Sequence, residues 1–179
     1  TPWTNEEVQS LYDANINEIR IDEVGSIIDE LDKNEDLSYT IYQSSENNKV
    51  TGYAIPIAGK GLWGTMYGYF AIEPDAETVK GITFYKHKET PGLGAEVDKD
   101  WFKNNFVGKK LTNKNGELVS IEVIKGYVSD TDPDAPHKVD GISGATITGT
   151  GLTTFLKSDL QKYEPYFAKV RSVNQIESL

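Results

Sequence analysis

The sequence contains no cysteine, and only two of its 179 residues are histidine. Without thiols the chain has no disulfide, no cysteine nucleophile, no cysteine-ligated zinc and no iron–sulfur cluster. His87 and His137 stand far apart in the sequence and have no cysteine or second histidine beside them, which argues against a histidine metal site. We therefore predict no metal centre and interpret both histidines as surface residues.

Long apolar runs and basic stretches are also missing. No run approaches the roughly 18 apolar residues that a membrane span requires, and no basic-then-apolar signal segment precedes Thr1. Any membrane anchor would lie outside this sequence. The formal net charge is -10 and is spread along the chain, so we predict no basic face for the phosphates of nucleic acid.

The composition that remains is typical of a globular protein, with 37% hydrophobic and 11% aromatic residues. A chain of this length forms one domain that buries about 70% of its unfolded surface. Thr4 and Glu7 have the spacing of a capping box, so a helix is predicted to begin there. A second helical spacing over residues 24–31 ends at residues 34–36. We divide the compact domain into an N-terminal helical segment, 1–36, and a main part, 37–179.

The main part is predicted to alternate between strands and turns. Strands are expected at residues 37–43, 50–58, 65–72 and 79–87, because apolar and polar residues alternate there. A short helix over 98–106 is expected to turn Trp101 and Phe102 inward. A hairpin is predicted within 108–128, an extended linker over 130–140, a helix ending near Leu160 and a shorter last helix over 163–170. Consecutive strands with helices at both ends indicate the α+β class with a largely antiparallel sheet.

Residues 59–64 read GKGLWG, which matches the dinucleotide-binding pattern G-x-G-x-x-G. That pattern needs a helix directly after it and an acidic residue about 20 positions further on. Here a strand-like segment follows, and Glu73 and Asp75 come too early. We therefore interpret GKGLWG as a structural corner that presents Leu62 and Trp63.

Residues 140–152 read DGISGATITGTGL, in which four residues carry hydroxyls and four are glycine. The G-I-S-G-A part has alanine where a nucleophile elbow needs its second glycine, which argues against a serine hydrolase. Two interpretations stay open at this point. The segment is either an ordinary hydroxyl-rich helix cap or a site where glycines and free helix N–H groups hold a phosphate.

A third glycine-rich loop, HKETPGLG at residues 87–94, is predicted to leave Glu89, Thr90 and Leu93 at its tip. Together with GKGLWG and SGAT, this loop supplies apolar tips and hydrogen-bonding neighbours. The three loops predict one pocket for a flat, partly apolar ligand that bears a phosphate.

Four stretches in this order and spacing resemble a known family: GKGLWGTMYGYFAI, GITFYKHKETPGLGAEV, VGKKL and VDGISGATIT. They resemble the C subunit of the sodium-translocating NADH:quinone reductases, over residues 50–167. ETPGLG and D-G-x-S-G-A-T also mark the wider family of extracytoplasmic FMN-binding domains, which includes the G subunit of the related ferredoxin:NAD reductase. The GKGLW…YGY segment favours the C subunit.

The resemblance implies that FMN is bound covalently, with its phosphate esterified to Thr146 by a separate flavin transferase. It implies that Asp140 and Gly141 are recognised by the transferase, and that Gly144 and Ala145 let the phosphate approach. Ser143 and Thr148 are expected to add hydrogen bonds to the phosphate oxygens. The residues expected to contact the flavin are Leu62, Trp63, Glu89, Thr90, Gly92 and Leu93.

The implied function is electron transfer within a respiratory complex that passes electrons from NADH to quinone and exports sodium. The resemblance implies a place on the extracytoplasmic side of the bacterial inner membrane, with other subunits of the complex as partners and an N-terminal membrane helix that this sequence lacks. The domain alone is expected to have no activity. Two alternatives remain at this point: the G subunit of the ferredoxin-linked complex, and a flavin-free module whose loops bind another ligand.

Overall fold

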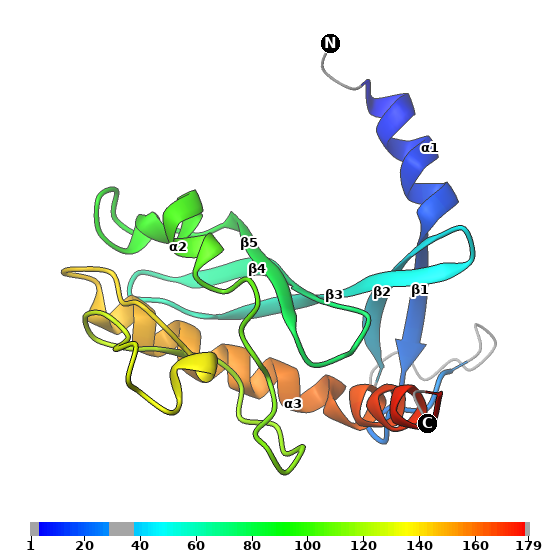
Figure 1. Cartoon of the computed structure of the whole chain (residues 1–179). Coiled ribbons are helices and arrows are strands. Elements are labelled where there is room, and N and C mark those ends of the chain that lie inside the picture. The colour runs from blue at the N-terminus through cyan, green and yellow to red at the C-terminus, as the bar shows by residue number, and fades with distance from the viewer. Residues whose placement is uncertain (1–3, 29–37, 178–179) are drawn as a thin grey trace.

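A five-stranded antiparallel sheet forms the centre of the computed structural model, in which residues 4–28 and 38–177 are described. Its strands lie in chain order, and each one pairs with the next along the sequence (Figure 1). The strands are β1 (Ile16–Ile21), β2 (Tyr39–Glu46), β3 (Lys49–Lys60), β4 (Thr65–Ile72) and β5 (Val79–Lys86). With α-helices at both ends of the chain, the architecture confirms the predicted α+β class with an antiparallel sheet.

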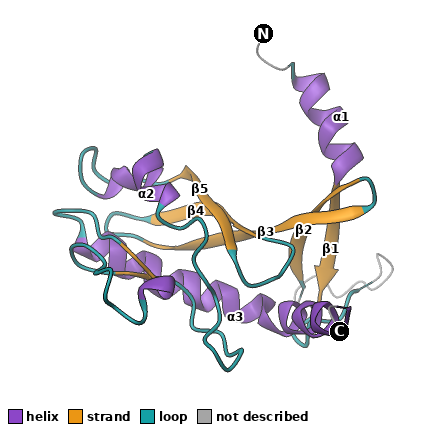
Figure 2. Ribbon diagram, viewed as in Figure 1, coloured by secondary structure: helices purple, strands orange, loops and turns teal. Residues whose placement is uncertain are grey.

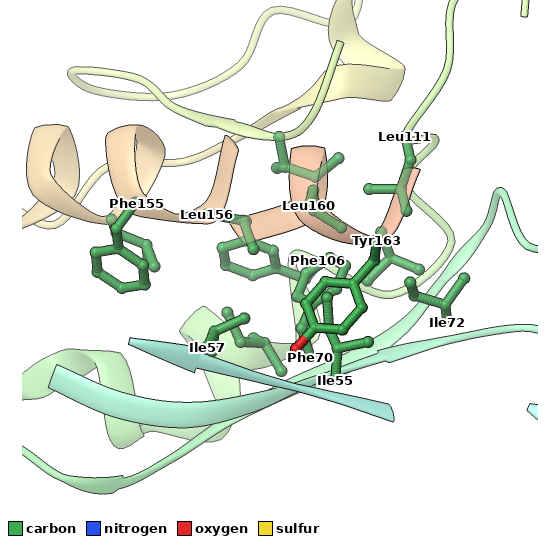
Figure 3. Close-up of a cluster of buried hydrophobic side chains, with 14 of the residues drawn as sticks. Ile55, Ile57, Phe70, Ile72, Phe106, Leu111, Phe155, Leu156, Leu160 and Tyr163 are labelled. Carbon is green, nitrogen blue, oxygen red and sulfur yellow. The ribbon is translucent and has the colours of Figure 1, made fainter. Parts of the chain in front are cut away.

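One long helix, α3 (Thr146–Glu177), runs along a single face of the sheet, as Figure 2 shows. The strands turn alternate side chains toward this helix, so that β4 buries Met66, Phe70 and Ile72 while Tyr69 on its other face is exposed. The helix contributes Leu156, Leu160 and other apolar side chains to the same layer (Figure 3). This sheet-on-helix core is what holds the start of α3 in place.

The predicted strand positions are confirmed within the described residues. The segment predicted over 65–72 coincides with β4, and the other three predicted strands overlap β2, β3 and β5. Asn47 and Asn48 both have positive φ in the turn between β2 and β3, a conformation that asparagine tolerates better than most residues. Alternating hydrophobicity and turn residues were therefore sufficient signals for these hairpins.

Helix α3 does not stop at Leu160 as predicted but continues through Pro165 to Glu177. An interior proline costs a helix roughly 3 kcal/mol. The residues on either side, Tyr163, Tyr166 and Phe167, are all buried against the sheet. Because burying each large apolar side chain is worth about 1.5–3 kcal/mol, the packing outweighs the proline.

The N-terminal part also differs from the prediction. Helix α1 (Asn5–Asn15) begins at the predicted capping box, with the Thr4 hydroxyl accepting a hydrogen bond from the Glu7 amide. Residues 16–21 then form β1, which pairs with β2 and joins the first segment to the sheet. The second predicted helix is not found over residues 24–28, which form a turn and a bridge between Ile21 and Ile27; its remaining residues lie outside the described ones.

The segment between β5 and α3 is mostly irregular, with a 3₁₀ helix over Gly94–Asp98 and the short helix α2 (Asp100–Asn104). Phe102 is buried as predicted, but Trp101 is 47% exposed, so the prediction for Trp101 is wrong. The predicted hairpin has its turn at Gly116 and only one bridge, Thr112 to Leu118. Instead, β6 (Glu122–Val123) pairs in parallel with β7 (Lys138–Val139). Strand β7 lies within the segment that was predicted to be an extended linker.

No helix within residues 4–28 and 38–177 combines the length and the apolar character that crossing a membrane requires.

Buried tyrosines predict a loss of stability at alkaline pH. Burial raises the pKa of Tyr53 to about 12 and also raises the pKa of Tyr163 and Tyr166. Because these folded pKa values exceed the unfolded value of about 10, the stabilisation is complete below about pH 10 and is lost as pH rises through the folded values. Thermal unfolding followed from about pH 8 to pH 12 is expected to show a falling free energy of unfolding, with tyrosinate absorbance appearing on unfolding. A melting temperature that stays constant over this range would contradict the prediction.

Candidate functional site

The predicted attachment residue lies at the N-terminal end of α3. Thr146 is the first residue of the helix and is exposed, whereas Ala145 before it is buried. The Gly149 amide donates to the Ala145 carbonyl and starts the helical hydrogen bonding. The amides of the first turn have no partner within the helix, so partial positive charge gathers beside the Thr146 hydroxyl. This end of the helix can stabilise a phosphate.

The GKGLWG corner is the turn between β3 and β4, closed by a hydrogen bond from the Gly61 amide to the Gly64 carbonyl. The corner leads directly into β4 and not into a helix, so the dinucleotide-binding interpretation is excluded by the structure. Leu62 and Trp63 stand at the tip and are 40% and 63% exposed. A Cβ atom built on Gly151 of α3 would lie 2.2 Å from the Lys60 carbonyl oxygen, so the corner and the helix start approach each other closely.

The ETPGLG loop reaches the same end of α3. Its turn is closed by hydrogen bonds from the Leu93 and Ala95 amides to the Thr90 carbonyl, and Gly92 has positive φ. Leu93 is 42% exposed, and its side chain contacts the helix-start loop, because a Cβ atom on Gly144 would lie 2.8 Å from Leu93 Cδ2. The two glycine-rich loops therefore touch through Leu93, and Figure 1 shows the loop ends gathered at one end of the molecule.

Glu89 and Thr148 do not stand at the surface. Glu89 is 6% exposed and Thr148 is 1% exposed. The Glu89 carboxylate accepts hydrogen bonds from the Trp63 amide at 3.0 Å and from the Thr148 hydroxyl at 2.5 Å. The structure thus directs the Thr148 hydroxyl to Glu89, and the predicted hydrogen bond from this hydroxyl to a phosphate oxygen would compete with it. Thr90 and Gly92, by contrast, are exposed.

Two cavities adjoin Thr146. One, of about 570 Å³, lies between α3 and the corner and is lined by Lys60, Gly61, Leu62, Thr146, Ile147, Thr150, Gly151, Thr154 and Phe155. The other, of about 460 Å³, lies between residues 122–127 and the residues that lead into α3. Ser143 and Gly144 line this second cavity. Each volume falls in the range of small-molecule sites, and Thr146 and Thr150 line both cavities.

The loop over residues 124–128 is a part of the site that the sequence did not reveal. The Asp140 carboxylate accepts a hydrogen bond from the Val128 amide at 2.8 Å, and the Gly141 amide donates to the Gly126 carbonyl at 2.8 Å. Tyr127, between the two bonded residues, lines the second cavity and a third one of about 530 Å³, which Gly92 and Trp101 also line. Asp140 therefore has a structural partner as well as the recognition role predicted for it.

The arrangement can hold a phosphate-bearing, partly apolar molecule at Thr146. Lys60 lines the cavity on one side of Thr146 and Lys125 the cavity on the other, and each supplies positive charge in a chain of net charge -10. Leu62 and Ile147 provide apolar surface on the side of the corner. The predicted site residues gather at this end of α3, but the side chains of Glu89, Ala145 and Thr148 lie beneath the surface.

Comparison with protein families and curated proteins finds relatives of this chain. Residues 61–161 match the FMN-binding domain family. The C subunit of the Na(+)-translocating NADH-quinone reductase of Pseudomonas aeruginosa is 40% identical over 134 residues, which are 74% of this chain and 51% of that protein. The C subunit of Chlamydia muridarum is 44% identical over 132 residues, or 66% of this chain and 42% of that protein. The chain spans about half the length of the curated relatives that it matches.

Two solved structures share the fold. The Shewanella oneidensis NqrC structure superposes with a TM-score of 0.80 at 24% identity and covers 95% of this chain and 90% of its own. The structure of the C subunit of the Na(+)-translocating NADH-quinone reductase from Parabacteroides distasonis superposes with a TM-score of 0.77 at 31% identity and covers 93% of this chain and 85% of its own.

Proposed function

The chain belongs to the FMN-binding domain family and, within it, to the C subunits of Na(+)-translocating NADH-quinone reductases, and we propose that it carries FMN covalently on Thr146 as an electron-transfer subunit. The observation that supports attachment at this residue is the position of Thr146. It is an exposed hydroxyl at the first turn of a long helix, between two cavities of suitable size.

The residues around Thr146 fit FMN in three respects. The free amides of the first turn of α3 would hold the phosphate, because a negative charge is stabilised there. Leu62, Trp63 and Leu93, all of which are partly exposed at the tips of their loops, would offer apolar surface to the ring system. The backbone can come close at Gly144, whose φ of 74° suits glycine.

When bound, FMN supplies the capacity to accept and pass on electrons, and the protein supplies binding and orientation. In the transferase reaction the Thr146 hydroxyl would lose its proton and bond to the FMN phosphorus of an activated donor, whose P–O–P bond would break and release the other phosphate as the leaving group. Leu62, Trp63 and Leu93 would exclude water from one side of the ring. Exposed Thr90 and Ser143 are the hydroxyls available for hydrogen bonds at the surface of the site.

The wider role is part of the same proposal. The domain works beside other subunits of a membrane complex that passes electrons from NADH to quinone and moves sodium outward. It stands on the extracytoplasmic side of the bacterial inner membrane and is anchored by a segment outside this sequence. By itself it is expected to show no NADH oxidation.

Co-expression with a flavin transferase tests the proposal directly. When the transferase is present, the intact mass of the chain is expected to rise by the mass of one FMN less one water. The denatured protein should keep its flavin fluorescence on a gel. A chain that stays unmodified beside a control substrate that is modified would favour the flavin-free alternative.

Substitution of Asp140 separates recognition from folding. Asp140→Asn keeps an oxygen that can accept from the Val128 amide, so we expect the melting temperature to stay within a few degrees of the wild type. If the transferase recognises the negative charge, this variant should nevertheless lose most of its flavinylation. Asp140→Ala, which also removes the acceptor, is expected to lower the free energy of unfolding by about 1 kcal/mol. Normal flavinylation of the asparagine variant would leave Asp140 with only its structural role.

A further inference from the structure

Glu89 is a buried carboxylate in a loop whose other tip residues are exposed. Acidic side chains are rarely buried unless they are paired. Among residues 4–28 and 38–177, no ion pair includes Glu89. Its position is therefore set by directional hydrogen bonds from neutral groups and not by an ion pair.

These hydrogen bonds join two elements that are far apart in the sequence. One oxygen, Oε1, accepts from the Trp63 amide in the corner between β3 and β4. The other, Oε2, accepts from the Thr148 hydroxyl, two residues after Thr146 in the first turn of α3. A single carboxylate thus fixes the tip of the corner to the helix start.

Two glycines leave the space that the carboxylate occupies. A Cβ atom built on Gly61 would lie 2.6 Å from Glu89 Oε1, and one built on Gly94 would lie 2.5 Å from Glu89 Oε2. Neither oxygen could stay in place beside a side chain at these positions. The second glycine of GKGLWG and the last glycine of ETPGLG therefore both make room for Glu89.

The backbone of Glu89 is held as well. Its amide donates to His87 Nδ1 at 3.1 Å, and His87 Nε2 lies 2.7 Å from Asp98 Oδ2. The loop is thereby anchored on the side where it leaves β5. These contacts fix the backbone position from which the Glu89 carboxylate reaches the corner.

We propose that Glu89 is a positioning residue of the flavin site: its carboxylate holds the Leu62–Trp63 tip at a fixed place relative to Thr146. The proposal rests on the function proposed above. Glu89 acts through Trp63 and Thr148 and not through a contact of its own with the flavin, because its carboxylate lies beneath the surface. Removing it should free the tip while leaving the attachment hydroxyl untouched.

The first test needs no flavin. Amide hydrogen exchange of Trp63 is measured by NMR in the unmodified chain for the wild type, Glu89→Ala, Glu89→Gln and Thr148→Val. Loss of its acceptor in Glu89→Ala should speed exchange of the Trp63 amide at least about tenfold. Glu89→Gln keeps an acceptor oxygen of the same shape and should stay close to the wild type, and Thr148→Val leaves the bond to Trp63 in place. A Trp63 amide that exchanges at the wild-type rate in Glu89→Ala would overturn the proposal.

The second test uses the flavinylated chain. An indole that packs on a flavin quenches its fluorescence, so native flavin fluorescence, relative to that of the same sample when denatured, reports the place of Trp63. The Trp63→Phe variant gives the native flavin fluorescence expected when no indole is present at this position. The flavin fluorescence of the Glu89→Ala protein should rise several-fold toward that of Trp63→Phe. The double variant Glu89→Ala/Trp63→Phe should show no further rise in fluorescence over Trp63→Phe.

Conservative variants and a matched control complete the test. Glu89→Gln and Thr148→Ser should keep the wild-type quenching. Thr148→Val should raise the fluorescence and serves if Glu89→Ala does not fold. Thr83→Val, at an exposed position of β5 that lines none of the three cavities, should change nothing. Wild-type quenching in both Glu89→Ala and Thr148→Val, or Glu89→Gln behaving like Glu89→Ala, would refute positioning by hydrogen bonds. Failure of the wild type to take up flavin would instead refute the proposed function, while the exchange result would still decide whether Glu89 holds the tip.

Discussion

Thr146→Val is expected to abolish covalent flavin while leaving the fold intact. Valine has nearly the shape of threonine but no oxygen to esterify. Thr146 is exposed at the start of α3, so the change creates no cavity and leaves no buried polar group without a partner. Surface substitutions of this kind usually change stability by less than about 0.5 kcal/mol. The measurement is intact mass after co-expression with the transferase, together with the melting temperature.

Two controls make the Thr146 result specific. Thr146→Ser keeps a hydroxyl and should retain part of the modification. Thr83→Val removes an exposed hydroxyl from β5, which lines neither of the cavities beside Thr146, and should keep full modification. Covalent FMN on the Thr146→Val protein would place the attachment elsewhere, and Ser143 would be the first residue to examine because it lines the adjoining cavity.

Gly59→Ala is expected to have the largest effect on stability among changes in the GKGLWG corner. A Cβ atom at Gly59 would lie 2.0 Å from the Cβ of Phe155, which is buried on α3. Helix and strand must move apart to admit it, and overpacking of this kind costs about 3 kcal/mol. For a domain of this size, that loss lowers the melting temperature by roughly 6–12 °C.

The same motif offers a matched control. A Cβ atom on Gly64 would meet nothing closer than Lys88 Cδ, at 3.7 Å. Gly64→Ala makes the same chemical change five residues away and should leave the melting temperature close to the wild type. Equal stability of the two variants would show that β3 and α3 tolerate separation at this point, contrary to the close packing of Gly59 on Phe155.

Several features of the protein follow from local sequence alone. The alternation of apolar and polar residues in TMYGYFAI defines β4, and the Thr4–Glu7 spacing defines the start of α1. Glycines and hydroxyls in DGISGATITGTGL mark where α3 begins. These signals are readable because each depends on residues that are close in the chain: the pleat of one strand, the cap of one helix, the turn of one loop.

Other features depend on partners that are distant in the chain. Residues 16–21 form a strand because they pair with the edge of β2. Residues 138–139 form a strand because they pair with β6. Helix α3 continues past Pro165 because the sheet buries the aromatic residues around it. In each case the favourable free energy comes from packing or pairing across the fold, which outweighs the local preference of the segment.

The candidate site shows the same division. The sequence by itself predicted three glycine-rich loops with apolar tips, and the family resemblance added an attachment threonine. The sequence predicted Glu89 at the tip of its loop, and the family resemblance placed it near the polar edge of the flavin. Only the tertiary structure showed that Glu89 is buried, because its two donors come from residues 26 and 59 positions away. A carboxylate is stable inside a protein only when such donors converge on it, and their convergence is decided by how β3, β4 and α3 pack together.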